Sequence, residues 1–367
     1  MTVTTSSRSA GANGHDVDLV VLGAGPVGLA TAIGAAQEGL RVVVLDPRDG
    51  PGDKACGEGL MPGARASLER LGVHLSHGPD ARQLVGIRYL SPGHVVQAPF
   101  RSGPGLGVRR TVLSQALQAR ADALGVVREQ QLAGVPRTDG DGVLVGGLRA
   151  RWCVAADGLH SPTRRALGLD APPRRSSGPA LPGRLRGRFG LRRHYRMAPW
   201  GDHVDVLWAR EAEAYVTPVA PDVVGVAVLT DVAGDLDSHL ARFPGLAARL
   251  HRVPHASSTR GAGPLRQVAR RRRSGRVLLV GDAAGYVDAL TGEGINVGLA
   301  CAREAVACVL DDDASDYERR WRRASRSYRV LTEGLLVASS VPLVRRAIVP
   351  AAQRLPRVFG AVVDRLA

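Results

Sequence analysis

The chain has 367 residues, which is long enough for two domains, and its 44% apolar and 23% charged content is that of a folded globular protein. The net charge of +15 would suit nucleic acid, anionic lipid or an acidic substrate. Because no nucleic-acid motif is present and only 4% of the residues are aromatic, we expect no nucleic-acid partner.

The first 16 residues are polar and rich in Gly, Ser and Ala, so they predict a disordered tail and not a signal peptide. No uninterrupted apolar run in the sequence reaches the length of a membrane-spanning helix. The four cysteines form no CxxC pair and no Cys/His metal spacing, so we predict no metal site. This cysteine usage fits a reducing cytoplasm, and we expect a cytoplasmic monomer or homodimer.

The most informative stretch follows the tail. Residues 19–22 form a short apolar run that predicts a buried strand, residues 29–38 predict a helix, and residues 41–45 predict a strand ending on Asp46. An acidic residue at that place can accept the hydroxyls of a ribose. The unit therefore predicts dinucleotide binding, and a plain βαβ crossover with packing glycines is the alternative.

The turn inside this unit reads Gly23-Ala24-Gly25-Pro26-Val27-Gly28. Gly23 permits the tight turn, Gly25 lets the backbone approach a pyrophosphate, and Gly28 lets the helix lie close to the strand. The N-terminus of the helix offers free N–H groups and a partial positive charge to phosphates.

A loop containing Pro47 and Arg48 leads to the run Lys54-Ala55-Cys56-Gly57-Glu58-Gly59. Two glycines beside a cysteine and an acid indicate a backbone pressed against another group. Residues 63–71 then predict a short helix, and residues 83–100 predict a hairpin that turns at residues 91–93.

Residues 111–121 carry a helical stripe of apolar side chains, with Thr111 as the predicted N-cap and Arg110 just ahead of it. Residues 143–156 predict a hairpin that leads into Asp157-Gly158, which alone is a generic turn signal. Residues 171–184 are rich in Pro, Gly, Ser and Arg and predict a linker.

β-rich runs between residues 185 and 231 predict a second, antiparallel region. Its aromatic side chains include Tyr195, Trp200, Trp208 and Tyr215, which either form its core or line a substrate pocket. His203 is a candidate base, and a surface histidine is the alternative interpretation.

A third strand at residues 276–280 ends on Gly281-Asp282-Ala283, and a glycine-rich loop leads to a helix over residues 295–310. The N-terminus of that helix can stabilise an anion. The last residues predict helices at 316–341 and 342–366, the second interrupted by Pro350 and Pro356. Because arginines and apolar residues alternate there, these helices either make weak peripheral contact with a membrane or pack on their own domain.

Three blocks, at residues 23–46, 156–164 and 281–296, resemble the motifs of FAD-dependent oxidoreductases of the p-hydroxybenzoate hydroxylase fold. That superfamily includes flavoprotein monooxygenases and geranylgeranyl reductases. The resemblance implies an α/β fold, in which a Rossmann-like FAD-binding domain carries an inserted antiparallel-sheet substrate domain and a C-terminal helical segment. After the tail at 1–16, the implied parts are an FAD-binding domain at 17–75, 101–180 and 262–310, a substrate-binding sheet at 76–100 and 181–261, and C-terminal helices at 311–367.

The resemblance also implies roles for single residues. Asp46 would bind the adenosine ribose, Asp157 would support the pyrophosphate loop, and Asp282 would hold the ribityl chain. Arg110 would lie on the FAD, and residues 292–296 would pass along the pyrimidine side of the flavin. The expected FAD-binding residues are Gly23, Gly25, Pro26, Val27, Gly28, Asp46, Pro47, Arg48, Lys54, Cys56, Gly57, Arg110, Asp157, Gly158, Ser161, Arg164, Gly281, Asp282, Ala283, Gly292, Glu293, Gly294, Ile295 and Asn296.

Residues 54–60 are similar to the Cys-Gly-Gly-Gly-type run of the reductase branch, with Glu58 in place of a glycine. The leading interpretation is an FAD-dependent monooxygenase that uses NADPH or NADH and O2 to hydroxylate or epoxidise a small aromatic, polyketide or isoprenoid-type substrate. A flavin-dependent reductase of a carbon–carbon double bond is one alternative, and a non-catalytic flavin-binding partner protein is another. The catalytic candidates are His203, Glu58 and Tyr215, and the expected substrate pocket consists of Cys56, Glu58, Tyr195, Trp200, Trp208 and Tyr215.

Overall fold

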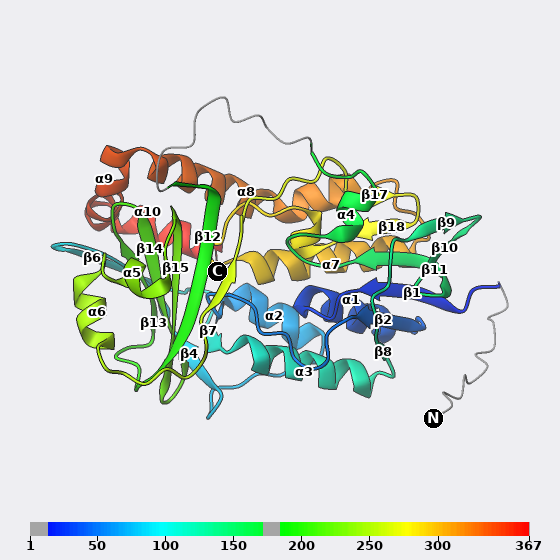
Figure 1. The fold of residues 1–367 in the computed structure, drawn as a ribbon, viewed down its shortest axis with the longest axis horizontal. Coiled ribbons are helices and arrows are strands. Elements are labelled where there is room, and N and C mark those ends of the chain that lie inside the picture. The colour runs from blue at the N-terminus through cyan, green and yellow to red at the C-terminus, as the bar shows by residue number, and fades with distance from the viewer. Residues whose placement is uncertain (1–13, 172–183, 367) are drawn as a thin grey trace.

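The computed structural model describes residues 14–171 and 184–366. Most of the predicted tail and linker, residues 1–13 and 172–183, lie outside the described residues. Of the tail, His15 is buried and the Asp16 carboxylate accepts a hydrogen bond from the Arg149 backbone N–H at 2.8 Å. Figure 1 shows an elongated molecule with one sheet towards each end and the C-terminal helices across its upper left side.

The first sheet is the core of the Rossmann-like domain. Its main path runs β17-β18-β11-β1-β2-β8, and β1 pairs in parallel with both β2 and β11. The alternation of strand and helix produces this parallel order, because each crossover helix returns the chain to the same edge of the sheet. The strands are β1 (Val17–Leu22), β2 (Val42–Asp46), β8 (Val127–Gln130), β9 (Arg137–Asp139), β10 (Gly142–Val145), β11 (Leu148–Ala155), β17 (Arg273–Ser274) and β18 (Val277–Leu279).

Helices cover this sheet and meet one another at α1, which packs on both α3 and α7. The apolar side chains of β1, β2 and β11 are buried beneath them in one core. The helices of this domain are α1 (Pro26–Gln37), α2 (Pro62–Arg70), α3 (Arg110–Ala123), α4 (Pro162–Ala166) and α7 (Gly294–Leu310), with a short 3-10 helix η1 (Gly281–Ala284).

Two predicted helix starts were wrong. The helix α1 begins at Pro26 and not at residue 29, because Gly25 is its N-cap and a proline at the first helical position loses no hydrogen bond. The N-cap of α3 is Arg109 and not Thr111. The backbone N–H of Arg110 donates at 2.8 Å to the distant Glu58 carboxylate, so a tertiary contact satisfies one of the free N–H groups at the start of this helix.

The second sheet has the order β16-β12-β15-β14-β13-β5-β6 and is antiparallel except where β5 runs parallel to β13. These two strands are joined by no hairpin, so nothing requires them to be antiparallel. Its strands are β5 (Gly86–Ser91), β6 (His94–Pro99), β12 (Arg184–Arg196), β13 (His203–Trp208), β14 (Ala212–Ala220), β15 (Val223–Val232) and β16 (Arg260–Ala262). A small third sheet is formed by β3 (Gly59–Leu60), β4 (Ala81–Leu84) and β7 (Gly105–Val108).

Both faces of the second sheet are covered. The outer face packs against α5 (Leu236–Leu240) and α6 (Pro244–Leu250), and the inner face packs against α9 (Pro342–Arg354) and α10 (Pro356–Leu366). The helix α8 (Tyr317–Ser340) leads from α7 to these last helices. Coverage on both sides explains why every residue of β14 is buried, including Glu213 and Thr217.

Pro350 lies inside α9 without ending it, whereas Pro356 begins α10. The predicted α/β fold, with a Rossmann-like domain, an inserted sheet domain and C-terminal helices, is confirmed.

Candidate FAD and substrate site

The glycine turn after β1 has the shape that a pyrophosphate requires. A Cβ atom on Gly23 would lie 2.6 Å from the Ala156 carbonyl oxygen, and one on Gly28 would lie 1.9 Å from the Gly23 carbonyl oxygen. Gly23 also has φ +101°, in the region that favours glycine. A Cβ on Gly25, by contrast, would meet nothing within 4 Å. The turn is therefore closed against the protein at Gly23 and Gly28 and open where a phosphate would approach Gly25, so the residues fit FAD at this point.

Asp46 stands at the end of β2 beside this turn. Its carboxylate accepts hydrogen bonds from the Ala24 N–H at 2.6 Å and from the Arg48 guanidinium at 2.7 and 2.9 Å. Burial raises the pKa of this carboxyl, but the bonds from Arg48 and Ala24 together outweigh burial and hold the pKa below its usual value. The charged Asp46 carboxylate thus stabilises the glycine turn, and its contact with a ribose stays a prediction.

The second block continues from β11 into α4. Ser161 caps α4 by accepting the Arg164 N–H at 2.9 Å, and Asp157 accepts the Thr163 N–H at 3.0 Å. The other carboxylate oxygen of Asp157 is buried and has no hydrogen-bond partner among the described residues. An orphaned buried acceptor at this turn fits a ligand that donates hydrogen bonds.

Arg164 joins the second block to the third. Its guanidinium is buried and donates to the carbonyl oxygens of Asp282 at 3.3 Å and Ala283 at 3.0 Å. It also donates to Asp170 at 2.5 Å and to Gln267 at 2.9 Å. This one side chain therefore holds two turns together that lie more than a hundred residues apart in the sequence.

The third block, at η1, lies against the first block. A Cβ on Gly281 would lie 3.2 Å from Val27, so η1 lies directly against the start of α1. Lys54 reaches the same place, because a Cβ on Gly158 would lie 2.9 Å from its Nζ atom. Burial raises the pKa of Asp282 and lowers that of Lys54, and the two opposite charges partly offset both effects. The three predicted FAD blocks and the Lys54 loop thus meet at one place.

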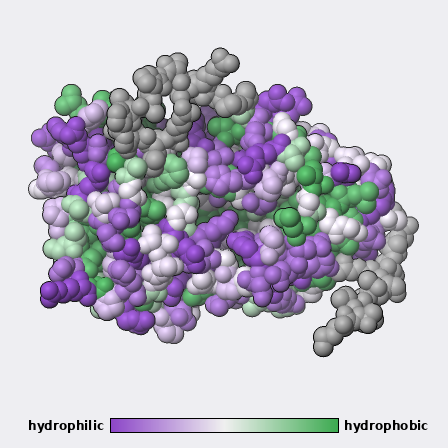
Figure 2. All heavy atoms as spheres, viewed as in Figure 1, coloured by the Kyte–Doolittle hydropathy of each residue, from purple (hydrophilic) through white to green (hydrophobic). Residues whose placement is uncertain are grey.

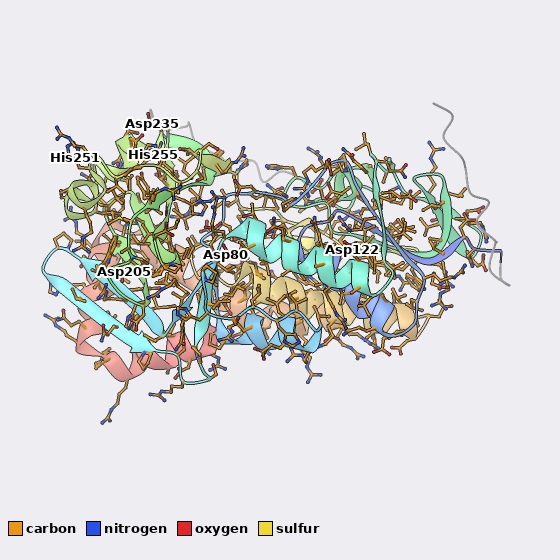
Figure 3. The ribbon with its side chains drawn as sticks, turned by 90° about the horizontal axis from the view of Figure 1, so that it is seen from below. Asp80, Asp122, Asp205, Asp235, His251 and His255 are labelled. Atoms are coloured by element: carbon orange, nitrogen blue, oxygen red, sulfur yellow. The ribbon has the colours of Figure 1, made fainter. Side chains whose placement is uncertain are left out.

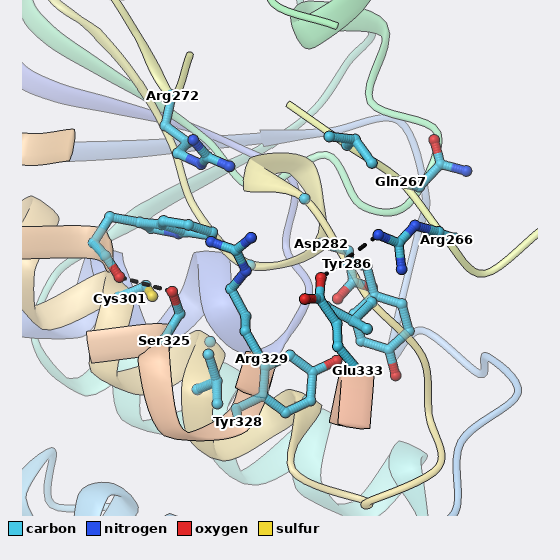
Figure 4. A pocket seen from close by; sticks show the side chains of 18 residues that line it. Arg266, Gln267, Arg272, Asp282, Tyr286, Cys301, Ser325, Tyr328, Arg329 and Glu333 are labelled. Carbon is cyan, nitrogen blue, oxygen red and sulfur yellow. Dashed lines mark hydrogen bonds and ion pairs between the residues drawn. The ribbon is translucent and has the colours of Figure 1, made fainter. Parts of the chain in front are cut away.

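A cavity of about 70 Å³ opens beside this place, between α7, α8 and the loop before η1. Figure 4 shows Glu333 beside Tyr286, and Arg329 and Tyr328 also line the cavity. Glu333 forms an ion pair with Arg266 at 3.5 Å.

The loop before α7 carries an unusual acid. Glu293 is the N-cap residue of α7, is buried, and has one carboxylate oxygen with no hydrogen-bond partner among the described residues. Burial raises its pKa to about 8, so the group is protonated at neutral pH and can donate a hydrogen bond. Gly292 beside it has φ +72°, and Ile295 and Asn296 lie half-buried in the first turn of α7. A neutral acid at a helix N-terminus suits a polar ligand such as the pyrimidine edge of a flavin.

The Cys56–Glu58 loop lies between the FAD blocks and the second sheet. Glu58 has φ +59°, rare for a residue with a side chain, and its buried carboxylate reaches His194 Nε2 at 2.5 Å. Its other oxygen accepts the Arg110 N–H, which anchors the loop to α3. Burial raises the pKa of the Cys56 thiol, so Cys56 is a neutral thiol rather than a thiolate.

His194 was missed by the sequence analysis, as was the set of residues around it. His194 Nδ1 lies 2.8 Å from the Ser257 hydroxyl, and Ser257 is half-buried. Arg192, two residues earlier on the same face of β12, pairs with Asp53 and donates to the Lys54 carbonyl oxygen at 3.1 Å. The sequence shows that Arg192 and His194, two residues apart in a strand, share one face. It does not show that this face is buried.

The expected substrate pocket does not form as one group. Trp208 and Tyr215 lie on the inner face of the second sheet, whereas Tyr195 and Trp200 lie on its outer face. His203 lines an outer-face hollow with Trp200 and pairs with Asp202 at 2.8 Å. The strand period of two residues, which a sequence alone cannot orient, separates these side chains.

Asp205 lies on the outer face of the second sheet and binds the side chains around it. Its carboxylate accepts from the Trp200 indole N–H at 3.0 Å and from the Arg88 guanidinium at 2.8 Å. Figure 3 labels Asp205 in the sheet domain and Asp122 on α3 of the FAD-binding domain. Of the predicted pocket residues, Cys56 and Glu58 therefore lie in the loop beside the FAD blocks, and Trp208 and Tyr215 lie on the inner face of the sheet.

A second polar cluster was also missed. Arg188 lies between Glu213 at 2.5 Å and Asp288 at 3.0 Å, and Arg345 from α9 reaches the same Glu213 at 2.5 Å. Burial raises the pKa of Asp288 to about 6, although the Arg188 charge opposes this. Nearby, the Tyr215 hydroxyl donates to the Leu290 carbonyl oxygen at 2.7 Å. These contacts join the inner face of the sheet to the loop that precedes α7.

Comparison with known proteins agrees with this geometry. The chain matches the family model described as "FAD binding domain" over residues 16–181 and 251–316, more than half of its length. It therefore belongs to this family of FAD-binding flavoproteins, and the predicted resemblance is confirmed. Its members bind FAD, and the chain is an FAD-dependent oxidoreductase by family.

Two relatives are similar along most of the chain. A menaquinone reductase of Mycolicibacterium smegmatis is 30% identical over 345 residues, which cover 83% of this chain and 79% of that protein. A digeranylgeranylglycerophospholipid reductase 1 of Methanothermobacter thermautotrophicus is 27% identical over 350 residues, covering 84% and 82%. Among solved structures, a flavoprotein/dehydrogenase from Cytophaga hutchinsonii has a TM-score of 0.80 at 17% identity and covers 95% of this chain and 92% of that chain. At that identity the likeness concerns the fold alone.

Proposed function

We propose that the protein is an FAD-dependent reductase that saturates a carbon–carbon double bond in an apolar, isoprenoid-type substrate, with NADPH or NADH as the electron donor. The observation that carries this proposal is the buried Glu58–His194 pair, which stands between the FAD blocks and the inner face of the second sheet. The two relatives described above, both named as reductases, support the same reaction class.

The reaction needs two components. Saturating a double bond breaks its π bond and forms two C–H bonds, one from a hydride and one from a proton. FAD, when bound, supplies the hydride after it has been reduced by the nicotinamide. The protein must supply the proton, and the buried contact between Glu58 Oε2 and His194 Nε2, which lie 2.5 Å apart, is suited to carry it.

The proton can be replaced from outside. Ser257 is half-buried and its hydroxyl lies 2.8 Å from His194 Nδ1, so a path of hydrogen bonds leads from solvent through Ser257 and His194 to Glu58. Arg192 Nη1 lies 3.0 Å from the same ring nitrogen. Because a guanidinium only donates hydrogen bonds, Nδ1 of the neutral ring accepts from it, and the ring N–H lies at Nε2, which faces Glu58.

The inner face of the sheet provides the apolar surroundings. Trp208, Tyr215 and Leu229 belong to one buried cluster with residues of α9 and α10. Such a surface fits a hydrocarbon chain and excludes water from the reacting centre.

The second candidate is a monooxygenase acting on a phenolic or isoprenoid-type substrate. The same buried pair also fits this candidate, because Glu58 and His194 can accept a proton from a phenol. The two relatives named as reductases favour the first candidate. A non-catalytic flavin-binding partner is the third candidate, and it would show bound FAD without turnover.

Product analysis under strict anaerobiosis separates these candidates. The purified protein is reduced with NADH or NADPH and mixed with a menaquinone or a digeranylgeranylglycerophospholipid, in the absence and in the presence of O2. A product that gains two hydrogen atoms without O2 supports the reductase. A product that gains an oxygen atom only in air supports the monooxygenase, and no product under either condition supports the third candidate.

Two variants test the role of the pair. Glu58→Gln and His194→Asn should lower substrate turnover by about 10²–10⁴-fold, the usual contribution of general acid catalysis. The rate of FAD reduction by the nicotinamide should stay unchanged, because that half of the reaction does not draw on this proton. His255→Asn, at an exposed histidine of the outer face, is the matched control. Unchanged turnover in both variants would remove the pair from the mechanism.

A further inference from the structure

The C-terminal helices carry an unusual share of the exposed apolar side chains. Among the described residues, fifteen large hydrophobic side chains are exposed. Eight of these lie within residues 330–362: Val330, Val337, Val341, Leu343, Val344, Leu355, Val358 and Val362. Scattered single exposures need no explanation, but a concentration in one short segment of the chain marks a surface for contact.

Four of these side chains lie on the outward sides of α9 and α10, and Val330 and Val337 lie on α8. On α9, Val349 and Arg345 are buried against the sheet domain, whereas Leu343 and Val344 are exposed. At 100° per residue, Leu343 shares the outward side with Ala347 and Ala351, both exposed. On α10, Phe359 and Val363 are buried, and Val358, Ala361 and Val362 are exposed. Each helix therefore carries exposed apolar side chains on its outward side, in addition to the side that packs on the sheet domain.

Exposed arginines lie on the same two helices, among and beside these apolar side chains. Arg346 and Arg354 are exposed on α9, and Arg357 and Arg365 are exposed on α10. The sequence has one acid after residue 341, Asp364, and that carboxylate pairs with Arg101 at 3.2 Å. Figure 2 shows apolar side chains among polar ones at the end of the molecule that α9 forms.

We propose that the outward sides of α9 and α10 dock on an anionic lipid bilayer, with the apolar side chains entering the interface and the arginines binding lipid phosphates. Amphipathic helices with apolar residues beside arginines lie in the plane of such an interface. This proposal does not depend on the proposed reaction, because binding to vesicles can be measured without turnover.

The docked helices are the ones that cover the candidate substrate region. Phe359 of α10 packs on Tyr89 with ring centroids 5.0 Å apart, and Tyr89 also contacts the inner-face Trp208. Val349 and Val363 belong to the same buried cluster as Tyr215. A lipid substrate in the bilayer would thus be separated from the inner face of the sheet only by α9 and α10.

Two other roles for this surface, a membrane-spanning helix and a dimer contact, fit the structure less well. No single helix of the described residues is long and apolar enough to cross a bilayer, and α8 with α9 meets that test only as a pair bent by 119°. In a two-fold dimer through this surface, Arg346, Arg354 and Arg357 would face copies of the same arginine-rich surface, which is unfavourable. An anionic membrane neutralises these charges instead.

Co-sedimentation with vesicles tests the proposal. The full-length protein with FAD is mixed with vesicles of phosphatidylcholine alone, or of equal parts phosphatidylcholine and phosphatidylglycerol. We expect binding to the anionic vesicles that weakens as salt is raised. The triple variant Leu343→Ser, Val344→Ser, Val358→Ser should lower the partition coefficient by at least about tenfold. It should keep its bound FAD and its thermal unfolding temperature.

Two controls make the result specific. Leu132→Ser with Val135→Ser removes exposed apolar side chains from the FAD-binding domain and should leave vesicle binding unchanged. Arg354→Gln with Arg357→Gln should weaken binding to the anionic vesicles only. Equal binding of wild type and triple variant, or no preference for anionic vesicles, would overturn the proposal. A wild-type dimer in light scattering that the triple variant loses would overturn it in favour of a second copy of this chain.

Discussion

Replacing Glu293 by glutamine should make the protein more stable at alkaline pH. The Glu293 carboxyl is buried at the start of α7 with one oxygen unpaired among the described residues, and burial raises its pKa to about 8 from an ordinary 4.5. Glutamine has the shape of the protonated acid and never ionises. The variant therefore preserves the neutral group that the folded protein requires.

The sign follows from proton binding. Between pH 4.5 and about 8 the folded protein keeps the Glu293 proton, whereas the unfolded chain loses it. The wild type therefore loses free energy of unfolding as the pH rises through this window, by about 1.4 kcal/mol for each pH unit. Above pH 8 the accumulated loss reaches about 5 kcal/mol. Below pH 4.5 the variant and the wild type should be nearly equal in stability.

Urea unfolding of FAD-depleted protein at several pH values from 5 to 9 measures this difference. The gap in free energy of unfolding between Glu293→Gln and wild type should grow steadily towards pH 8 and then level off. Glu69→Gln, at an exposed position of α2, should show no such growth. A gap that stays constant across the range, or a variant less stable than wild type at pH 9, would refute the assignment of a buried, protonated Glu293.

Three further substitutions test the assembly of the site. Gly25→Val should lower FAD affinity at least about tenfold in a fluorescence titration, because the side chain would fill the open space before the turn, while Gly245→Val on α6, also open, should not. Arg164→Leu should cost about 3–5 kcal/mol in chemical unfolding, since it leaves Asp170 and several carbonyl oxygens without their buried partner, and exposed Arg165→Leu should cost less than about 1 kcal/mol. Tyr215→Phe should cost about 1–2 kcal/mol by the same measurement, because the Leu290 carbonyl oxygen loses its donor.

The Rossmann-like unit could be predicted because its signals are local. The buried run of β1, the open turn at Gly25 and the acid that ends β2 each depend on neighbours within a few residues. The joint order of the three blocks was enough to predict FAD, and the family match confirmed it. Errors at helix starts were small. At α3 the helix begins without a side-chain cap, and Glu58, fifty-two residues away in the sequence, accepts from its first N–H group.

The substrate side of the site could not be predicted to the same degree. Tyr195 and Tyr215 are the same residue type and both lie within a strand, yet they lie on opposite faces of the second sheet. Alternation tells which residues share a face, but coverage of both faces by helices removes the polar pattern that would tell the faces apart. His194 and Arg192 were missed for the same reason, since a strand this rich in arginine reads as exposed.

By itself, then, the amino-acid sequence determined the turns that hold the cofactor, because a glycine without a side chain and a carboxylate after a strand act over short distances. The tertiary structure alone decided the partners: Arg164 with the third block, Glu58 with His194, and Arg188 with Glu213 and Asp288. Each of these pairs joins charged or polar groups that no periodicity relates. They meet only because packing two sheets and the C-terminal helices around one buried region leaves every such group in need of a partner.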